Sequence, residues 1–304
     1  MQQSDATLVL EGVSKSFDEF VAVEGLSLRA RRGRIFGLLG PNGAGKTTTI
    51  RMIVGITAPD AGRVELFGRP LTPESRDRIG YLPEERGLYK KMKVGEQLRF
   101  FAELKGLDGR AAERESDRWL ARMRLTDWKQ KKTDELSKGM QQKVQFIAAV
   151  LHDPDLLILD EPFSGLDPVS VETMKAAVLD LQAAGKTIIL STHLMEQAER
   201  LCADICLINR ARKVLGGSLR EVKQSYGRNT VALRLEGGDG VLDDAALVAS
   251  VKRHSDGAEV LLAAGADAQE LLRRLVAAGA RVSKFEQVEP SLRDIFISKV
   301  GEEG

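Results

Sequence analysis

The stretch GPNGAGKT, residues 40–47, decides the fold of this chain. It fits the pattern G-x-x-x-x-G-K-[ST], whose glycines let the backbone curl so that its N–H groups point at phosphate oxygens. An apolar run at residues 35–39 precedes it and a helical stretch at residues 48–54 follows, which is the context that this pattern requires. A glycine-rich turn at a helix start is the alternative, but strand, loop and helix together favour a phosphate-binding loop.

We expect the phosphates of a nucleotide to lie against this loop and the helix that it opens. The N-terminus of the helix contributes the positive end of its dipole. Lys46 supplies a cation for the β- and γ-phosphates, and the Thr47 hydroxyl can coordinate Mg²⁺. The nucleotide-binding residues predicted from the loop are Gly40, Pro41, Asn42, Gly43, Ala44, Gly45, Lys46, Thr47 and Thr48.

Two acidic residues follow an apolar run at residues 156–159. A buried strand that ends in carboxylates places them at the carboxyl edge of the sheet, where ligands bind in open α/β folds. We therefore expect Asp160 to hold Mg²⁺, directly or through water, and Glu161 to act as the general base on the attacking water. A strand that merely ends in polar residues is the alternative, and the phosphate loop upstream argues against it.

Between these motifs, LSKGM at residues 136–140 opens a helical stretch. A serine and a glycine at a helix start are typical of a cap. The same arrangement can bind an anion. The residues alone leave both interpretations open.

The order of apolar runs and helical stretches predicts an α/β core with a largely parallel sheet. Helical patterns at residues 94–125 and 138–152 lie between two expected strands and predict a helical subdomain at about residues 92–150. The pattern changes near residues 223–229, after which short alternating runs and two helical stretches predict a small C-terminal α+β domain. The expected boundaries are residues 7–222 for the nucleotide-binding domain and residues 228–304 for the C-terminal domain.

Composition and charge narrow the class of protein. Lys and Arg number 45 against 44 Asp and Glu, so the basic excess of a nucleic-acid-binding protein is missing and no nucleic acid partner is expected. No run reaches the roughly 18 apolar residues that span a bilayer, and the N-terminus lacks a signal-peptide pattern. If this protein acts at a membrane, we therefore expect another chain to supply the membrane-spanning part. Cys202 and Cys206 lack further ligand residues and are interpreted as small buried side chains whose free thiols fit a reducing cytosol.

The ordered motifs closely resemble the ATP-binding subunit of ABC transporters over about residues 7–220. GPNGAGKTT is similar to their Walker A motif, LSKGM stands where they have the LSGGQ signature, and LLILDEP is similar to their Walker B motif. SGLD at residues 164–167 resembles their D-loop, and Thr192 with His193 resembles their switch-histidine motif. The resemblance implies a P-loop NTPase core with an ABC-type helical subdomain and an antiparallel β subdomain, and an ATPase that uses ATP and Mg²⁺.

The resemblance also implies a composite site. Two subunits, identical or different, would pack head to tail with ATP between them, so that Ser137 and the Gly139 N–H contact the γ-phosphate held by the other subunit. His193 would sense the γ-phosphate and hold the attacking water, although a lone histidine is otherwise more often a satisfied core residue. Phe17 falls where the family stacks an aromatic ring on adenine and is the expected adenine contact.

Two positions depart from the family pattern. The glutamine expected after the sequence GYLP is Glu84, which can still ligate Mg²⁺ and take part in catalysis but adds a negative charge beside the triphosphate. Its effect on the ATPase rate therefore stays open. The last residue of the signature is Met140 instead of glutamine. Because Ser137 and Gly139 carry the phosphate contact, the composite site is still expected to form.

We expect an ATPase subunit that powers a separate membrane permease and is held by it at the cytoplasmic face of the membrane. YLPEERGLY and the small C-terminal domain resemble export-type subunits, for which sodium or a drug-like molecule would be the cargo. The segment at residues 84–97, which includes Tyr89, is where the family docks its permease.

One alternative is a soluble ABC ATPase acting on ribosomes or DNA, although such chains usually carry two cassettes, a long coiled coil or a zinc hook. A metabolic P-loop kinase is disfavoured by the signature and the D-loop.

Overall fold

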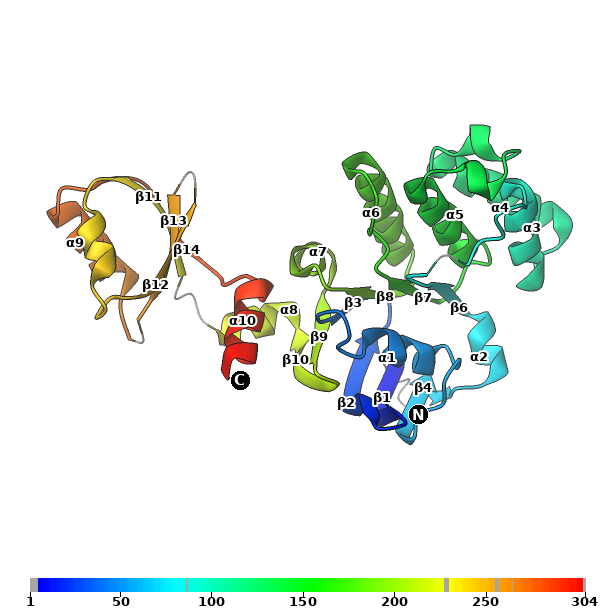
Figure 1. Ribbon diagram of the computed structural model, residues 1–304, viewed down its shortest axis with the longest axis horizontal. Coiled ribbons are helices and arrows are strands. Elements are labelled where there is room, and N and C mark those ends of the chain that lie inside the picture. The colour runs from blue at the N-terminus through cyan, green and yellow to red at the C-terminus, as the bar shows by residue number, and fades with distance from the viewer. Residues whose placement is uncertain (1–4, 86, 227–229, 255–256, 264, 303–304) are drawn as a thin grey trace. The chain divides into compact units, whose positions relative to one another are not determined.

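The fold is seen in a computed structural model that describes the chain except residues 1–4, 86, 227–229, 255–256, 264 and 303–304 (Figure 1). The chain forms two compact units, Met1–Leu219 and Arg220–Gly304. The expected domain boundary at residue 222 lies within a helix, α8 (Leu219–Ser225). The expected start of the C-terminal domain at residue 228 lies outside the described residues.

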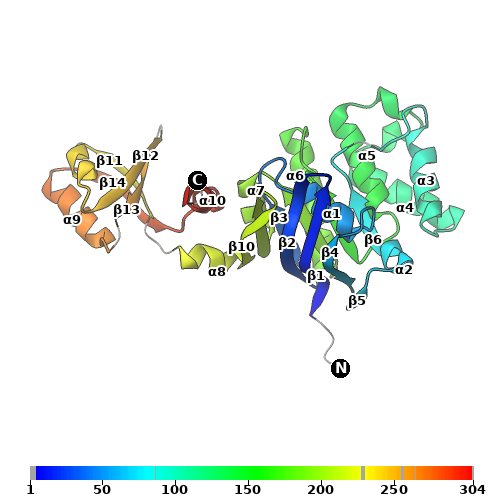
Figure 2. The same ribbon diagram turned by 60° about the horizontal axis from the view of Figure 1, so that its bottom comes forward.

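A six-stranded sheet forms the centre of the first unit, in the order β10-β9-β3-β8-β7-β6. All neighbouring pairs from β9 to β6 are parallel, and β10 pairs antiparallel with β9. Helices α5 and α6 lie on one side of this sheet, and α1 with a second sheet lies on the other (Figures 1 and 2). The strands are β3 (Ile35–Leu39), β6 (Ile79–Leu82), β7 (Leu156–Asp160), β8 (Thr187–Thr192), β9 (Asp204–Asn209) and β10 (Arg212–Ser218).

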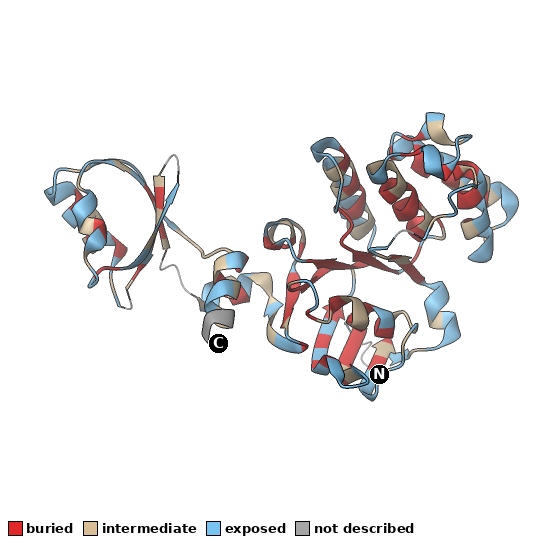
Figure 3. Cartoon of the chain, viewed as in Figure 1, coloured by how far each residue is buried: buried red, intermediate tan, exposed pale blue. Residues whose placement is uncertain are grey.

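The burial of the central strands explains why their sequences are continuous apolar runs. Every residue of β3, β7 and β8 is buried, because both faces of a parallel sheet are covered by other layers (Figure 3). The polar residues at the ends of β7 and β8 are buried as well. These strand ends therefore need hydrogen-bond partners inside the protein.

The second sheet is antiparallel, in the order β2-β1-β4-β5. Its apolar side chains share one core with α1 (Lys46–Ile53) and the central sheet, including Leu10, Leu26, Leu38 and Ile50. This packing fixes the helix that the phosphate loop opens. The strands are β1 (Ala6–Phe17), β2 (Phe20–Arg31), β4 (Ala61–Leu66) and β5 (Arg69–Pro70).

The helical region consists of α3 (Val94–Leu104), α4 (Gly109–Arg122), α5 (Lys138–Val150) and short 3₁₀ helices at Thr126–Trp128 and Thr133–Glu135. The helical pattern at residues 94–125 forms two helices, because Gly106 adopts a φ of +89° and Asp108 caps α4 by accepting the N–H groups of Arg110 and Ala111. Trp119 of α4 packs edge-on against Phe146 of α5, with 5.9 Å between ring centroids.

The sequence patterns do not predict β9 and β10. A short apolar run such as that in β9 cannot be told from a continuing helix by its period alone. Cys206 lies in β9 and Cys202 just precedes it. Both side chains are buried as the sequence predicted, and burial raises the pKa of each thiol to about 12.

The other helices of the first unit are α2 (Pro73–Asp77), α6 (Pro168–Ala183) and α7 (Met195–Leu201). Throughout the described part of the chain, no helix is both long enough and apolar enough to cross a membrane.

The second unit contains an antiparallel four-stranded sheet in the order β12-β13-β11-β14. Its inward-facing residues pack against α9 (Ala268–Ala277) and the 3₁₀ helix at Asp239–Asp243, in a core that includes Val231, Val260 and Leu271. This is the α+β arrangement that the alternating runs predicted. The strands are β11 (Thr230–Glu236), β12 (Val248–His254), β13 (Gly257–Leu262) and β14 (Arg281–Val288), and α10 (Leu292–Glu302) ends the unit.

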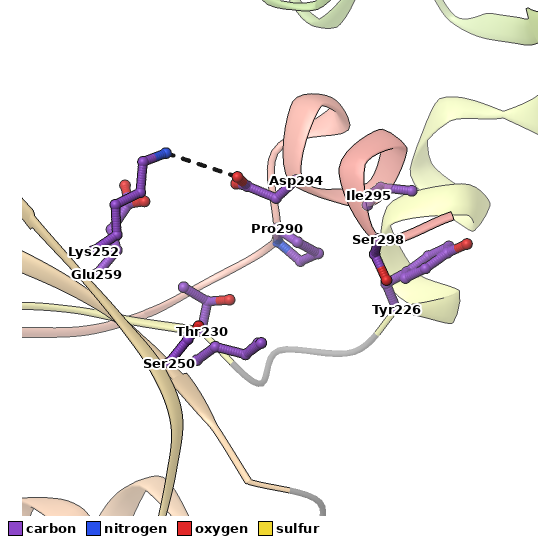
Figure 4. A pocket seen from close by; sticks show the side chains of 10 residues that line it. Tyr226, Thr230, Ser250, Lys252, Glu259, Pro290, Asp294, Ile295 and Ser298 are labelled. Carbon is purple, nitrogen blue, oxygen red and sulfur yellow. Dashed lines mark ion pairs between the residues drawn. The ribbon is translucent and has the colours of Figure 1, made fainter. Parts of the chain in front are cut away.

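A pocket of about 190 Å³ opens between the outer face of this sheet and α10 (Figure 4). Its charged side chains already have partners. Lys252 Nζ lies 3.8 Å from Asp294 Oδ1, and Glu259 Oε2 lies 3.7 Å from His254 Nε2. The pocket therefore presents hydroxyl groups and charged side chains that already have ion-pair partners. Among the residues described, its lining offers no unpaired charged side chain that would indicate a catalytic group.

Candidate functional site

Two glycines of the phosphate loop lie where a side chain would collide with the backbone of a neighbouring strand. Gly45 has a φ of +107°, and a Cβ built on it would lie 2.4 Å from the carbonyl oxygen of Ala22 in β2. A Cβ on Gly40 would lie 2.2 Å from the carbonyl oxygen of Ile208 in β9. Both contacts are with backbone, which cannot move aside. The loop is thus held between the two sheets of the first unit, and its glycines permit that approach.

Lys46 is the buried cation of the loop. Its Nζ donates to the carbonyl oxygens of Gly40 at 2.8 Å and Pro41 at 3.0 Å, which holds the side chain folded back over the loop. Burial lowers the pKa of the Lys46 ammonium from its usual value, and the carboxylates of Glu161, Asp160 and Glu84 act in the opposite direction. A buried cation facing several carboxylates is poised to exchange its carbonyl contacts for phosphate oxygens.

Asp160 ends β7 and is completely buried. Thr47 Oγ1 donates to its Oδ2 at 3.1 Å, and Ser191 Oγ donates to its Oδ1 at 2.7 Å. Burial raises the pKa of Asp160, the two hydroxyl groups oppose this, and the nearby charges of Glu84 and Glu161 add to the rise. A divalent cation beside Asp160 would neutralise part of the negative charge of these carboxylates.

The donor set fits Mg²⁺. The Thr47 hydroxyl and the Asp160 carboxylate are hard oxygen ligands that are already in hydrogen-bond contact with each other. The described residues contain no group of three or more His, Cys, Asp or Glu side chains able to hold a metal by themselves. Mg²⁺ in nucleotide sites is commonly held by one or two protein oxygens together with phosphates and water.

Glu161 turns away from the strand that precedes it. Its φ of +48° lies in the left-handed region, which is uncommon for a residue with a side chain. The turn directs the carboxylate toward the end of β8, where Thr192 Oγ1 donates to Oε2 at 3.1 Å. His193 donates its backbone N–H to Oε1 at 2.9 Å, and its ring Nδ1 lies 2.7 Å from the same oxygen. The structure thus brings the predicted site residues Glu161 and His193 into hydrogen-bond contact.

Residues of the phosphate loop, Glu84 and Glu161 line a pocket of about 340 Å³ in the first unit. Most of its lining was predicted from the sequence, including Glu84 and Glu161. The predicted residues that are not part of its wall in the structure described are Phe17, Gly40, Pro41, Ala44, Ser137, Gly139, Asp160 and His193. The lining residues are Phe20, Ala22, Asn42, Gly43, Gly45, Lys46, Thr47, Thr48, Glu84 and Glu161.

The aromatic residue on the pocket wall is Phe20, which sequence reasoning missed. Phe17 ends β1 and Phe20 begins β2, and the two are paired across the turn that joins these strands. Phe20 is 63% exposed, so its ring is free to stack on a base, and Phe17 is 46% exposed with Lys15 Nζ 5.5 Å from its ring centroid. The signal available in the sequence was a second aromatic residue three positions after the first.

We predict that Phe20→Ala weakens ATP binding more than Phe17→Ala does. Stacking of a base on an aromatic side chain contributes about 1–3 kcal/mol, so the Kd for ATP should rise roughly tenfold or more in the Phe20 variant. The measurement is a titration with a fluorescent ATP analogue. A larger rise for Phe17→Ala would assign the stacking to Phe17, as the family resemblance implies.

Comparisons with known proteins identify the family. A family described as ABC transporter matches residues 23–164, and a family described as ATP-binding protein DrrA1-3-like, C-terminal domain, matches residues 217–300. The chain is 47% identical to an uncharacterized ABC transporter ATP-binding protein of Bacillus subtilis, YhaQ, over 97% of this chain and 98% of that protein. The chain belongs to the ABC transporter ATP-binding proteins. It is therefore an ABC transporter ATPase.

Further relatives of this ABC ATPase have named roles or solved structures. It is 41% identical to Nod factor export ATP-binding protein I of Burkholderia pseudomallei, over 77% of this chain and 81% of that protein. A solved structure described as the ATP binding subunit of an ABC transporter superposes with a TM-score of 0.68 and 33% identity, over 73% of this chain and 93% of the other. For cbiO1 of Clostridium perfringens the TM-score is 0.64 at 28% identity, over 72% and 91% of the two chains. The predicted fold is thereby confirmed.

The signature of this ABC ATPase lies at the start of α5. Ser137 is the N-cap of that helix, and its Oγ accepts the N–H of Met140 at 3.2 Å. Gly139 lies against the D-loop, because a Cβ built on it would be 3.3 Å from Leu166 Cδ2. Within the described residues, neither Ser137 nor Gly139 contributes to the wall of the nucleotide pocket in the same chain. Ser137 therefore caps α5, as one of the two interpretations of LSKGM predicted.

Proposed function

We propose that this ABC ATPase powers a separate membrane permease that exports its cargo, with sodium or a drug-like molecule as the cargo class. The observation that carries the direction of transport is the 41% identity to Nod factor export ATP-binding protein I of Burkholderia pseudomallei. The alternative of a soluble ABC ATPase on ribosomes or DNA has no comparable support.

We assign the nucleotide to the pocket of about 340 Å³, with its phosphates on the loop from Gly40 to Thr48. Lys46 binds the β- and γ-phosphates, and Thr47, Asp160 and Glu84 provide the oxygen atoms that hold Mg²⁺. When bound, the ion neutralises charge on the β- and γ-phosphates. The negative charge of Glu84 makes nucleotide binding without Mg²⁺ less favourable than a glutamine would at this position.

In this proposal Glu161 is the general base for the attacking water, and His193 holds that water and the γ-phosphate. As a carboxylate, Glu161 only accepts hydrogen bonds, so His193 Nδ1 must carry a proton to make its 2.7 Å contact with Glu161 Oε1. This contact fixes the orientation of the ring and leaves Nε2 for the substrate. The arrangement matches a base with an adjoining residue that orients it.

The composite site requires a second ATPase subunit. Ser137 and Gly139 would contact the γ-phosphate bound by the partner, which makes ATP part of the interface between two identical or related chains. Hydrolysis then removes the phosphate that joins them and lets the pair open. The structure of cbiO1, described as part of the transporter complex cbiONQ, supports the view that such a chain works within a larger assembly.

The test of this function is ATP hydrolysis by the purified chain with and without the co-expressed permease. We expect the permease to retain the chain at the cytoplasmic face of the membrane and to change its ATPase rate. In inverted vesicles, accumulation of sodium or of a drug probe that depends on ATP would assign the cargo. Activity that responds to ribosomes or DNA and ignores every membrane fraction would favour the alternative.

An exposed aromatic cluster marks the surface where we propose that the permease docks. Tyr89 is 55% exposed, and its ring stacks on Phe101 at 6.2 Å and meets the edge of Phe100 at 6.1 Å between centroids. The backbone N–H of Tyr89 donates to Gln97 Oε1 at 2.7 Å, which anchors the segment to α3. Exposed apolar groups of this kind are typical of interaction surfaces.

We predict that Tyr89→Cys forms a disulfide or a bifunctional-reagent crosslink to the permease in membranes. Background reaction is low, because Cys202 and Cys206 are buried with raised pKa values. Ile56→Cys is the matched control, since Ile56 is a comparably exposed apolar residue of the same unit at 66% exposure. Crosslinks from position 56 but none from position 89 would contradict this docking surface.

A further inference from the structure

Two neighbouring parallel strands end in complementary polar pairs. Strand β7 leads into Asp160 and Glu161, and strand β8 ends with Ser191 and Thr192. The register places Asp160 opposite Ser191. Each hydroxyl reaches one carboxylate, at 2.7 Å from Ser191 Oγ to Asp160 Oδ1 and 3.1 Å from Thr192 Oγ1 to Glu161 Oε2. Ser191 is completely buried and Thr192 is 1% exposed, so neither hydroxyl is in contact with bulk solvent.

The proton of the Thr192 hydroxyl has a defined direction. Its oxygen accepts the backbone N–H of Leu194 at 3.1 Å, which fixes the side chain from the other side. A hydroxyl has one hydrogen to donate, and a carboxylate can only accept. Thr192 therefore donates to Glu161 Oε2, while the turn after β8 holds the donor in place.

The two oxygens of Glu161 are occupied unequally. Oε1 accepts the backbone N–H of His193 at 2.9 Å and faces the His193 ring Nδ1 at 2.7 Å, so both of its lone pairs are used. Oε2 accepts only the Thr192 hydroxyl from the residues that the structure describes. The lone pair that remains for a proton is therefore on Oε2, the oxygen that Thr192 orients.

We propose that Thr192 and Ser191 are positioning residues of the ATPase reaction. Thr192 aims the basic lone pair of Glu161 Oε2 at the attacking water, and Ser191 holds Asp160 so that its other oxygen, Oδ2, faces Thr47 and the metal position. Neither hydroxyl touches ATP in this scheme. The inference rests on the proposed role of Glu161 as base and of Asp160 as a Mg²⁺ ligand.

Strand β8 also offers a matched control with a purely structural hydroxyl. Thr187, at the other end of the strand, is 1% exposed. Its Oγ1 lies 2.8 Å from Thr7 Oγ1 and accepts the N–H of Gly33 at 3.0 Å. Thr187→Val removes a buried hydroxyl from the same strand without touching Asp160 or Glu161. It should lower the melting temperature and leave kcat unchanged.

The first test is Thr192→Val in the full-length chain, with Thr192→Ser as the conservative variant. Losing a hydrogen bond to a charged group that matters in the transition state should lower kcat roughly tenfold or more. The KM for ATP, and the Kd of a fluorescent ATP analogue, should stay within about twofold, because the hydroxyl does not contact the nucleotide. Thr192→Ser should restore most of kcat. A kcat for Thr192→Val equal to that of Thr187→Val would overturn the proposal for Thr192.

The second test concerns Ser191 and does not depend on turnover. In Ser191→Ala, the Mg²⁺ concentration needed for half-maximal binding of the ATP analogue should rise roughly tenfold, since loss of a residue that orients a metal ligand commonly weakens metal binding by 10–100-fold. Ser191→Thr should restore it. An unchanged Mg²⁺ midpoint would overturn the proposal for Ser191.

Glu161→Gln separates failure of this inference from failure of the proposed function. If Glu161→Gln keeps the full rate of ATP hydrolysis, Glu161 is not the general base, and Thr192 then has no base to position. If Glu161→Gln abolishes turnover while Thr192→Val does not, the function stands and the positioning role of Thr192 is wrong.

Discussion

Glu161→Gln is expected to bind ATP with nearly unchanged affinity and to hydrolyse it about 10²–10⁴-fold more slowly, the range lost when a general base is removed. The amide keeps the size of the carboxylate and can still accept from His193 Nδ1, which lies 2.7 Å from Oε1 in the native protein. It cannot take a proton from water. Initial rates of phosphate release and equilibrium binding of an ATP analogue measure the two effects separately.

The same variant should accumulate as a dimer when ATP and Mg²⁺ are present. In the proposed composite site, uncleaved ATP would continue to join the phosphate loop of one subunit to Ser137 of the other. Size-exclusion chromatography coupled to light scattering, with ATP and then with ADP, detects this state. The matched control is Glu196→Gln, which makes the same chemical change in the first turn of α7, outside the nucleotide pocket. Turnover by Glu161→Gln equal to that of this control would remove Glu161 from the role of base.

Mixing two inactive variants is expected to restore ATP hydrolysis. Lys46→Ala removes the phosphate cation, and Ser137→Asp places a negative charge against the γ-phosphate held by the partner. Aspartate caps a helix as well as serine does, so α5 should keep its start. In a mixed dimer with two-fold symmetric contacts, one site combines an intact phosphate loop with an intact signature, and about a quarter of the native rate should return.

The control for charge is Ser137→Asn, which also caps the helix but adds no repulsion. It should retain more activity than Ser137→Asp. The decisive comparison is between each variant alone and the mixture, at equal total protein. Full activity of Ser137→Asp by itself would contradict the composite site, because the structure places Ser137 away from the wall of its own pocket.

The phosphate loop could be predicted because its residues act together locally. The glycines, Lys46 and Thr47 are consecutive, and strand β3 and helix α1 on either side are set by short apolar patterns. The ends of β7 and β8 could be predicted for a similar reason, since apolar runs without alternation indicate a buried parallel sheet. Asp160, Glu161 and His193 were therefore identifiable from sequence and from the family resemblance.

Other features depend on contacts that no local pattern contains. Phe17 and Phe20 are equally plausible neighbours of the loop in sequence, and the turn between β1 and β2 decides that Phe20 is on the pocket wall. The two-helix division of residues 94–125 follows from a left-handed Gly106 and the Asp108 cap, which a helical period does not reveal. Strands β9 and β10 become recognisable only through their pairing with β3 and with each other.

The sequence by itself determined that this chain belongs with ABC ATPases and predicted its phosphate-binding loop at residues 40–48, because consecutive residues carry that chemistry. The tertiary structure decided how the acidic residues are held. Asp160 and Glu161 meet Ser191 and Thr192 only because β7 and β8 are adjacent and in register. The physical reason is that buried carboxylates require donors, and in a parallel sheet those donors come from a neighbouring strand that is about thirty residues away in the sequence.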